Sequence, residues 1–233
     1  METNYESLIS KSCKNIPKSF VREILSVCDK PEFISFAGGL PNPTYFPVEQ
    51  MREAFEKIMA TDGKTTLQYA ESQGYYPLRQ WICNWYNARY NMQITPENIL
   101  ITNGSQQALD MTGKLFINPG EPLMMEKPSY LGAIQAFSAY QPEFRQISLT
   151  DKGIDLNELE DVVLKTGARI LYGIPNFQNP TGISYSRQTR EDLAILLDWY
   201  GIMFIEDDPY NEIRFEGDWL PPVYTLNPAR TVW

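Results

Sequence analysis

The sequence predicts an α/β domain in which a mostly parallel sheet carries helices on both faces. From residue 95 onward, short apolar segments typical of strands alternate with longer segments whose apolar residues recur at helical spacing. Gly, Pro, Asn and Asp gather between these segments, as expected of loops. Strand and helix alternating in this way indicate a sheet that is covered on both sides. Apolar residues make up 43% of the 233 residues, which is enough to bury a sizeable core.

The part of the chain before residue 95 is predicted to be helical, with one long loop. Residues 1–32 are expected to form an N-terminal arm with a helix near 19–28, and residues 33–233 to form one large domain. The segment 33–47 contains Gly38-Gly39 and three prolines, which predicts a loop. Two amphipathic helices are predicted to follow, at 48–59 and 76–90.

The alternation after residue 95 gives the elements of the sheet in order. Short apolar segments predict strands at 98–102, 122–126, 144–149, 168–174 and 203–206. Segments with helical spacing predict helices at 105–116, 131–140, 156–165 and 187–200. The last residues, 228–233, are again typical of a strand.

Composition excludes several classes of function. The net charge of −9 argues against a nucleic-acid partner, because phosphate binding needs clustered Lys and Arg. The chain has no histidine, which removes Ser-His-Asp triads, HExxH zinc sites and histidine acid–base schemes. Cys13, Cys28 and Cys83 are widely spaced, so no metal site is expected and a reducing compartment is favoured. Without a signal peptide or a long apolar run, we expect a cytoplasmic protein with no membrane partner.

Four predicted loops follow strands and carry polar side chains suited to a ligand. In open α/β sheets, ligands bind at the carboxyl ends of the strands, so these loops are expected to meet at one edge. They are 103–106, 127–130, 175–182 and 207–210.

Each candidate residue in these loops has a functional and a structural interpretation. Ser105 and Gln106 begin a helix and offer a phosphate free N–H groups at the positive end of the helix dipole, although Ser105 is also a good N-cap. Tyr130 could stack on a planar ring or be a core aromatic. Asn179 could donate to a ring oxygen or serve a turn. Asp207 could pair with a protonated ring nitrogen, or cap a helix, or pair with an arginine at the surface.

Seven stretches of the sequence resemble those of a known family. They are FVREIL, ISFAGGLPNPTYFP, LQYAESQGYYPLR, TNGSQQALD, EKPSYLGA, PNFQNPTG and IEDDPY, and their order and spacing are highly specific. The chain resembles the fold-type I, class I/II aminotransferases over nearly its whole length, and within them the 2-aminoadipate and kynurenine aminotransferases. The resemblance implies an aminotransferase-like large domain with pyridoxal phosphate as cofactor. The implied reaction moves an amino group between an L-amino acid and a 2-oxo acid.

The resemblance implies roles for residues at the phosphate and the ring face of the cofactor. Ser105 and Gln106 would hold the phosphate, and Tyr130 would stack on the pyridine ring. Tyr69 would reach the phosphate of the neighbouring subunit, which implies a homodimer with shared active sites.

The resemblance also implies roles at the ring edge and at the substrate. Asn179 and Tyr210 would bond the phenolic oxygen, and Asp207 would keep the ring nitrogen protonated. Gly39 would lie against the substrate carboxylate, where a Cβ would not fit. Arg22 would read the substrate side chain, or be a solvated arginine on an exposed helix.

One residue that the resemblance implies is not in the sequence. The family's lysine, which forms a Schiff base with the cofactor, is expected beyond Trp233, together with the C-terminal part of the domain. We therefore expect this chain to contain no catalytic residue, to be inactive as given, and to bind pyridoxal phosphate weakly and non-covalently at most. Pro128 and Pro180 lie in tight loops where the family can have cis X–Pro bonds, so the resemblance implies cis bonds there.

Three other functions fit parts of the sequence. One is a pyridoxal-phosphate-dependent lyase on the same scaffold, such as an aminocyclopropane-carboxylate synthase. Another is the sensor domain of a MocR-type transcription regulator, which the acidic charge and the short segment before the GGLP loop disfavour. A third is a non-catalytic binding or dimerisation remnant. The amino acid substrate, whether aminoadipate, an aromatic amino acid or a similar one, stays open.

Overall fold

The computed structural model describes residues 5–14, 16, 39 and 41–233. These residues fall into two compact units. The larger unit is built chiefly from Asn84–Gln93 and Thr102–Trp233, and the smaller unit from 41–83 and Ile94–Ile101. The short helical segments of the chain are η1 (Tyr5–Leu8), α1 (Lys11–Lys14), η2 (Pro43–Tyr45), η3 (Pro96–Asn98), η4 (Asn211–Ile213) and η5 (Val223–Thr225).

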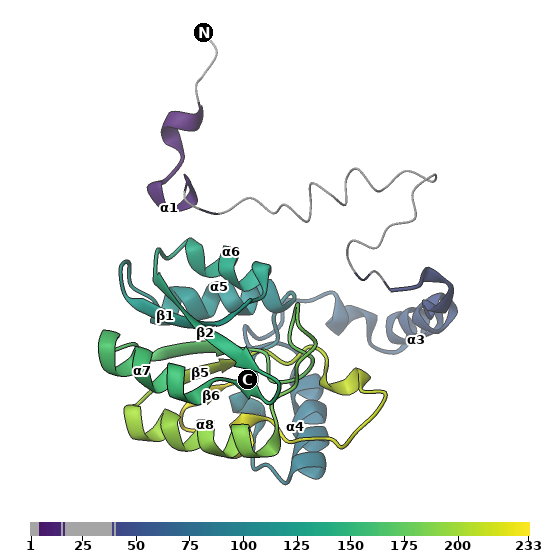
Figure 1. The fold of residues 1–233 in the computed structure, drawn as a ribbon. Helices are drawn as coiled ribbons and strands as arrows, with labels where there is room; N and C mark the ends of the chain where they lie inside the picture. Colours follow the sequence, from purple (N-terminus) through teal and green to yellow (C-terminus); the bar gives the residue numbers. More distant parts are fainter. Residues whose placement is uncertain (1–4, 15, 17–38, 40) are drawn as a thin grey trace, which may run out of the picture. The chain divides into compact units, whose positions relative to one another are not determined.

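A six-stranded sheet forms the centre of the larger unit, with the strand order β3-β2-β1-β4-β5-β6 (Figure 1). All neighbouring pairs are parallel except β2 and β3, which are antiparallel. The strands are β1 (Pro122–Lys127), β2 (Glu143–Thr150), β3 (Gly153–Ile154), β4 (Ile170–Gly173), β5 (Met203–Glu206) and β6 (Thr231–Val232). The mostly parallel sheet expected from the sequence is confirmed.

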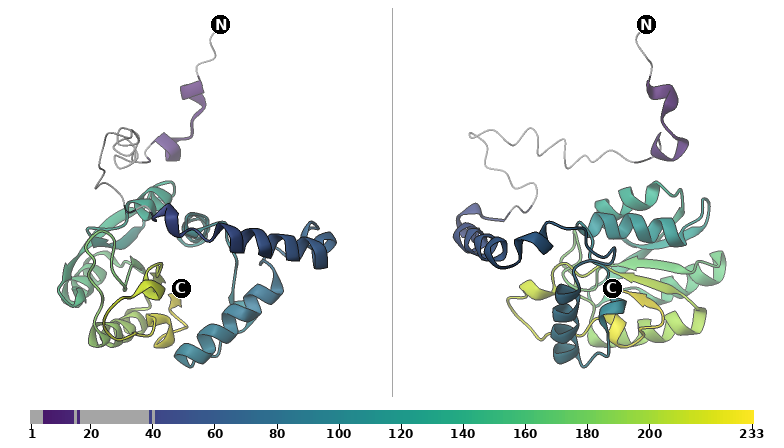
Figure 2. Two further views of the ribbon diagram at one scale, coloured as in Figure 1. Left: turned by 90° about the vertical axis from the view of Figure 1, so that its right-hand side faces the viewer. Right: turned by 180° about the vertical axis from the view of Figure 1, so that it is seen from behind.

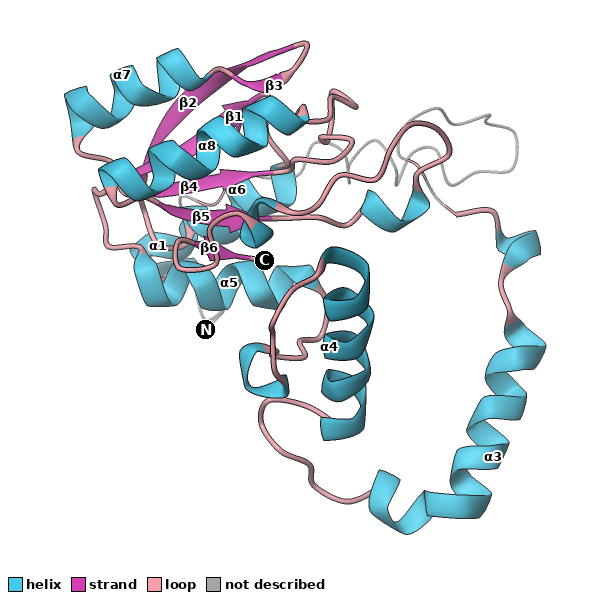
Figure 3. Cartoon of the chain, turned by 90° about the horizontal axis from the view of Figure 1, so that it is seen from below, coloured by secondary structure: helices cyan, strands magenta, loops and turns pink. Residues whose placement is uncertain are grey.

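Two pairs of helices cover the two faces of this sheet (Figure 1; from behind in Figure 2, right). One face carries α5 (Ser105–Phe116) and α6 (Leu131–Ser138). The other carries α7 (Leu156–Thr166) and α8 (Arg187–Tyr200); in Figure 3 α8 passes in front of the strands and α7 lies beside β2. The prediction of helices on both faces is confirmed.

Alternate strand residues supply a separate core on each face. On β1, Met124 packs in the core that holds the apolar sides of α7 and α8, whereas Leu123 and Met125 pack with α5 and α6. Tyr172 of β4 lies on the α5–α6 side and is fully buried. Successive side chains of a strand point to opposite faces, so a strand covered on both faces is apolar throughout.

Two helices of the larger unit, α7 and α8, begin at side-chain caps and end at glycines. Asp155 precedes α7, and its carboxylate accepts hydrogen bonds from two N–H groups of the first turn, at 3.0 and 3.1 Å. Ser186 caps α8 in the same way. Gly167 and Gly201 follow these helices at φ 68° and 64°, a left-handed conformation that glycine adopts without strain.

The smaller unit holds α3 (Val48–Thr66) and the start of α4 (Tyr76–Tyr90), and it is organised by a buried arginine. The Arg79 guanidinium donates to the carbonyl oxygens of Gly74 and Pro96, both at 3.0 Å, and to the carboxylate of Glu71. Its side chain therefore joins the loop before α4 to the segment after it.

One predicted strand is absent. The segment 98–102 was expected to be a strand, but η3 ends at Asn98 and residues 99–102 are irregular. The N–H of Ile101 donates to the carbonyl of Gln73 at 2.9 Å, which is a bond to a loop and not part of a ladder. A short apolar segment looks the same in a sequence whether or not another strand lies beside it, so the prediction was wrong.

The remaining differences lie at the ends of elements. The helix expected at 48–59 continues to Thr66, the one expected at 131–140 ends at Ser138, and the strand expected at 168–174 spans Ile170–Gly173. The hairpin partner β3 was not predicted, because two residues carry no periodic signal. The helix expected at 19–28 lies outside the described residues.

Within the described ranges, no helix is long and apolar enough to cross a membrane. The same residues contain no group of three or more His, Cys, Asp or Glu side chains that could hold a metal ion.

Candidate functional site

The candidate site lies at the carboxyl ends of β1, β4 and β5. The chain leaves β1 toward β2 on one side, while β4 lies on its other side, so the strand order reverses between β1 and β4. A reversal of this kind opens a crevice at the carboxyl ends of the strands, where α/β sheets bind their ligands. The loops at this edge are 128–130, 174–182 and 207–210.

Asp207 follows β5 directly and is half-buried at this edge. Its backbone N–H donates to the carbonyl of Gly173 at 3.0 Å, which fixes the main chain. Its Oδ2 accepts a hydrogen bond from the Tyr172 hydroxyl at 2.7 Å. Burial raises the pKa of Asp207, and the Tyr172 bond opposes that rise. Within the described structure, the charge of this half-buried carboxylate is stabilised by one hydrogen bond from the protein, so the carboxylate is suited to pair with a protonated nitrogen of a ligand.

Asn179 and Tyr210 come together from two different loops. The Asn179 side-chain amide donates to the Tyr210 hydroxyl oxygen at 3.2 Å. Because that oxygen accepts from the amide, the Tyr210 hydroxyl hydrogen can donate to a third group. The pair can therefore present donors to one oxygen of a ligand.

Tyr130 and Gln106 meet over Gly132. Tyr130 is half-buried, precedes α6 and packs on the core of the α5–α6 face. A Cβ on Gly132 would overlap both the hydroxyl end of Tyr130 and the side-chain amide of Gln106. Gly132 thus allows the two side chains to approach each other, and no pattern in the sequence indicated this.

The start of α5 is open to solvent. Gly104 occupies the N-cap position at φ 83° and has no side chain to satisfy the first N–H groups of the helix. Ser105 is the first helical residue and is exposed, so the interpretation of Ser105 as an N-cap is wrong. Free N–H groups, a hydroxyl and the positive end of the helix dipole are the groups that a phosphate needs.

A buried carboxylate, Glu126, holds the loops after β1 and β4 in place. It accepts hydrogen bonds from the N–H of Ile174 at 3.1 Å, the Gln178 amide at 3.0 Å and the Tyr185 hydroxyl at 2.6 Å. The same Gln178 amide donates to the carbonyl of Pro128 at 2.8 Å. Burial raises the pKa of Glu126 to about 7, against the effect of its hydrogen bonds. This network supports the loops that carry Tyr130 and Asn179.

Asp208 points into a second network and not toward the surface. Its Oδ1 accepts from the Asn176 amide at 2.8 Å, and the Asn176 oxygen accepts from Arg190 at 2.7 Å. Burial raises the pKa of Asp208, which Asn176 and Arg190 oppose. In the part of the chain that the structure describes, neither Asp207 nor Asp208 forms an ion pair with an arginine, so the alternative of a surface pair is not supported.

Three predicted site residues are not brought to this edge by the described structure. Tyr69 belongs to the smaller unit and is fully exposed. Gly39 is exposed, and a Cβ there would have no neighbour within 4 Å. Arg22 lies outside the described residues. The peptide bonds before Pro128 and Pro180 are both cis, as expected.

Two residues of the site were missed by sequence reasoning. Tyr172 and Glu126 sit within apolar strands, where an aromatic residue or a strand-end acid carries no functional signal of its own. Gln178 stands inside the PNFQNPTG stretch and was quoted there, but nothing in the stretch distinguishes it from Asn179 as the residue that faces inward.

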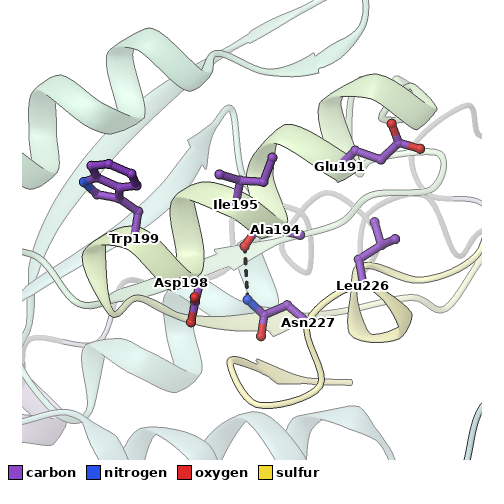
Figure 4. Close-up of a pocket in the computed structure, with 7 residues that line it drawn as sticks. All are labelled: Glu191, Ala194, Ile195, Asp198, Trp199, Leu226 and Asn227. Atoms are coloured by element: carbon purple, nitrogen blue, oxygen red, sulfur yellow. Dashed lines mark hydrogen bonds between the residues drawn. The ribbon is translucent and has the colours of Figure 1, made fainter.

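A separate pocket lies along α8, away from these loops (Figure 4). Asn227 donates to the carbonyl of Ala194 at its base, at 3.0 Å, and none of the predicted site residues lines it. Its lining is Glu191, Ala194, Ile195, Asp198, Trp199, Leu226 and Asn227.

The chain matches one family of known proteins. Residues 37–228 match the family model described as aminotransferase class I and II. The chain is 39% identical over 225 residues to the aromatic-amino-acid aminotransferase 1 of Thermococcus litoralis, covering 94% of this chain and 54% of that protein. It is 40% identical over 223 residues to the 2-aminoadipate transaminase of Thermus thermophilus, covering 96% and 55%.

A solved structure gives the same result for the fold. The kynurenine aminotransferase of Pyrococcus horikoshii, crystallised in complex with PMP, superposes with a TM-score of 0.91 at 36% identity. The match covers 98% of this chain and 58% of that one. The chain thus spans a little more than half the length of the relatives it matches.

Proposed function

Because the chain belongs to the class I and II aminotransferase family, we propose that it binds pyridoxal phosphate at the carboxyl ends of β1, β4 and β5. In the whole protein this site would serve the transfer of an amino group between an L-amino acid and a 2-oxo acid. The observation that carries the proposal is the half-buried Asp207 carboxylate, whose neighbours at the same edge are the Asn179–Tyr210 pair.

The donors and acceptors at the edge fit the chemistry of this cofactor. A pyridoxal phosphate ring has a basic nitrogen, a phenolic oxygen and a flat face, and it carries a phosphate. Asp207 offers an acceptor to the protonated nitrogen, and the Asn179–Tyr210 pair offers donors to the phenolic oxygen. Tyr130 offers an aromatic face. The ring nitrogen, the phenolic oxygen and the ring face each have a counterpart among these side chains.

The phosphate would lie at the start of α5. Ser105 and Gln106 are exposed there, and the N-cap Gly104 leaves the first N–H groups of the helix without a side-chain partner. Gln106 also meets Tyr130 over Gly132, which supports a phosphate position close to the ring-stacking residue.

When bound, the cofactor supplies an electron sink for the carbanion at the substrate α-carbon. Asp207 would hold the ring nitrogen protonated, since a carboxylate accepting a hydrogen bond from a pyridinium favours the charged ring. The Glu126 network would hold the loops of Tyr130 and Asn179 in a fixed position while substrates bind and products leave.

The substrates are proposed as a class. The names of the relatives include aromatic amino acids, 2-aminoadipate and kynurenine, so an amino acid with a long or aromatic side chain is the class that we propose. Gly39 and Arg22 keep the substrate-binding roles that the resemblance implies. A lyase or a regulator is not favoured by these relatives.

We also propose that the protein is a homodimer with shared active sites. Tyr69 is fully exposed, as a residue that reaches into a partner subunit would be. Apolar side chains recur every three or four residues along α3 and are 46–66% exposed: Val48, Met51, Phe55 and Ile58. Light scattering should report a dimer, and Phe55→Glu should shift it to monomer while Lys57→Glu should not. A monomer for the unaltered chain would contradict the proposal.

Two further assignments accompany the proposal. A cytoplasmic location is supported by the free thiols of Cys13 and Cys83, and localisation of a tagged protein tests it. The net charge of −9 supports the expectation that nucleic acid is not a partner.

Calorimetric titration with pyridoxal phosphate tests the proposed site. Binding to the unaltered chain should be saturable, and Asp207→Ala should weaken it by roughly tenfold or more, because a hydrogen bond to a charged group contributes about 1.5–3 kcal/mol. Asp110→Ala, which removes a surface carboxylate of α5, is the matched control and should leave the affinity unchanged. Equal affinities for all three chains would contradict the proposal.

A further inference from the structure

Tyr172 is placed by the sheet with its ring in the core and its hydroxyl at the edge of the candidate site. It lies on β4, one residue before the carboxyl end of the strand, and is fully buried. Its ring packs edge-on against Phe137 of α6, with centroids 5.7 Å apart and an interplanar angle of 73°. The ring is therefore held by the core of the α5–α6 face, and the hydroxyl has little freedom to move.

The main chain fixes Asp207 beside that hydroxyl. β4 pairs with β5 in parallel, with Tyr172 opposite Ile205 and Gly173 opposite Glu206. The N–H of Asp207 then bonds to the carbonyl of Gly173, which extends the ladder by one step. Both partners of the Tyr172–Asp207 hydrogen bond are thus set by backbone pairing and not by loop conformation.

The chemistry of the pair fixes which partner donates. The Tyr172 phenol is buried beside the carboxylates of Asp207 and Glu126, and burial together with these charges raises its pKa far above the ordinary range. The phenol therefore keeps its proton and donates it to Oδ2 of Asp207 at 2.7 Å. Among the described residues, no second donor reaches this carboxylate, so Oδ1 is left for a ligand.

Resting on the proposed function, we propose that Tyr172 is a positioning residue that holds one oxygen of Asp207 so that the other meets the ring nitrogen of the cofactor. Removing the hydroxyl should free the carboxylate to rotate about its last bond. The affinity would then depend less on whether the ligand has a ring nitrogen.

A simpler role has to be distinguished from this one. A buried tyrosine hydroxyl needs some acceptor, and Asp207 could merely satisfy it. In that case Tyr172→Phe would affect all ligands of the site alike. The other ionisable groups that interact with Asp207 are Glu126 on β1 and Asp208 beside it, and the phenol of Tyr130 ahead of α6 interacts with Tyr172; all three are retained in the variant.

The first experiment needs no cofactor. The carboxyl carbon of Asp207 is followed by NMR against pH in the unaltered chain and in Tyr172→Phe, and the Asp207→Asn spectrum assigns the signal. Loss of the hydroxyl should raise the pKa of Asp207 by about one pH unit, since a donor to the charged form favours that form. Tyr140→Phe is the matched control, because Tyr140 donates to the surface carboxylate of Asp110 at 2.8 Å. An unchanged pKa of Asp207 in Tyr172→Phe would overturn the proposal.

The second experiment compares pyridoxal phosphate with its 1-deaza analogue, in which carbon replaces the ring nitrogen. The unaltered chain should prefer pyridoxal phosphate by roughly tenfold. Tyr172→Phe should lose most of this preference, while Tyr140→Phe should keep it. Thermal unfolding of each variant confirms that it is folded. Should Tyr172→Phe not fold, Asp207→Asn replaces it, and it must lose the preference as well.

The outcomes separate the two claims. If the unaltered chain binds neither ligand, the proposed function fails and this inference fails with it. If it binds pyridoxal phosphate and Tyr172→Phe keeps the full preference for the ring nitrogen, the inference alone is overturned.

Discussion

Glu126 and Asp207 are two carboxylates at the same edge of the sheet, and their surroundings differ. Glu126 ends a buried stretch of β1 and accepts hydrogen bonds from Ile174, Gln178 and Tyr185. Asp207 follows β5, is half-buried, and accepts from Tyr172. Both oxygens of Glu126 accept hydrogen bonds from other groups of the protein. Among the described residues, Asp207 uses only Oδ2 in this way, so its Oδ1 can bind a ligand. The comparison indicates that Glu126 stabilises the loops and that Asp207 serves a ligand.

The largest expected effect comes from removing the satisfied carboxylate. Glu126→Ala leaves three buried donors without their acceptor, so the free energy of unfolding should fall by about 3 kcal/mol or more. Urea denaturation measures it. Glu160→Ala, which removes the acceptor of the half-buried Tyr200 hydroxyl, is the control and should cost about 1 kcal/mol, well below the loss at Glu126. Similar losses in the two variants would contradict the prediction that the Glu126 network contributes more to stability than the Tyr200–Glu160 bond.

The pH dependence of stability gives a second test of Glu126. Its folded-state pKa of about 7 lies above the unfolded value of 4.5, so the folded chain binds the proton more tightly. The stability from this group is complete below about pH 4.5 and is lost as the pH rises through 7. Relative to Glu126→Gln, the unaltered chain should therefore lose on the order of 3 kcal/mol between these limits. Glu206, whose pKa is also raised to about 7, contributes equally to both chains and cancels. If the free energy of unfolding changes with pH in the same way in the unaltered chain and in Glu126→Gln, this expectation is contradicted.

A smaller effect on stability is expected at Gly132, with a clear effect on binding. In Gly132→Ala the new methyl overlaps the ends of the Tyr130 and Gln106 side chains, which can swing away. The free energy of unfolding should fall by about 1–2 kcal/mol, while the affinity for pyridoxal phosphate falls several-fold. Gly63→Ala on α3, where a Cβ has room, is the control. An unchanged affinity in Gly132→Ala would separate Tyr130 and Gln106 from the site.

The smallest effect on stability is expected at Asp207. Asp207→Asn keeps an oxygen that can accept from Tyr172 and removes a half-buried charge, so the free energy of unfolding should change by less than about 1 kcal/mol. Binding of pyridoxal phosphate should nevertheless be weakened. A large loss of stability in this variant would remove the contrast with Glu126 and place Asp207 among the structural carboxylates.

The spacing of apolar residues in the sequence predicted most of the helices and strands, but it did not predict the contacts at the site. Helices such as 76–90, 105–116 and 187–200 have apolar residues at regular spacing, and they were predicted to the residue. The strand expected at 98–102 failed because pairing depends on a neighbour that the local sequence does not specify.

The site itself could be predicted only as far as its loops. Asp207 and Asn179 were found because polar residues after apolar strands stand out in a sequence. Tyr172 could not be found, because its hydroxyl reaches Asp207 through the register of β4 against β5, a tertiary fact. The roles of Tyr69, Gly39 and Arg22 stay predictions.

The most direct test of the central claim is the protonation of the cofactor's ring nitrogen when it is bound to this chain. Pyridoxal phosphate labelled with ¹⁵N at the ring is titrated into the unaltered chain and into Asp207→Ala, and the ¹⁵N shift is followed against pH. We predict that the bound nitrogen stays protonated to a higher pH in the unaltered chain than in the variant, because Asp207 accepts its hydrogen bond. The same titration curve in both chains, or no bound signal at all, would contradict the account.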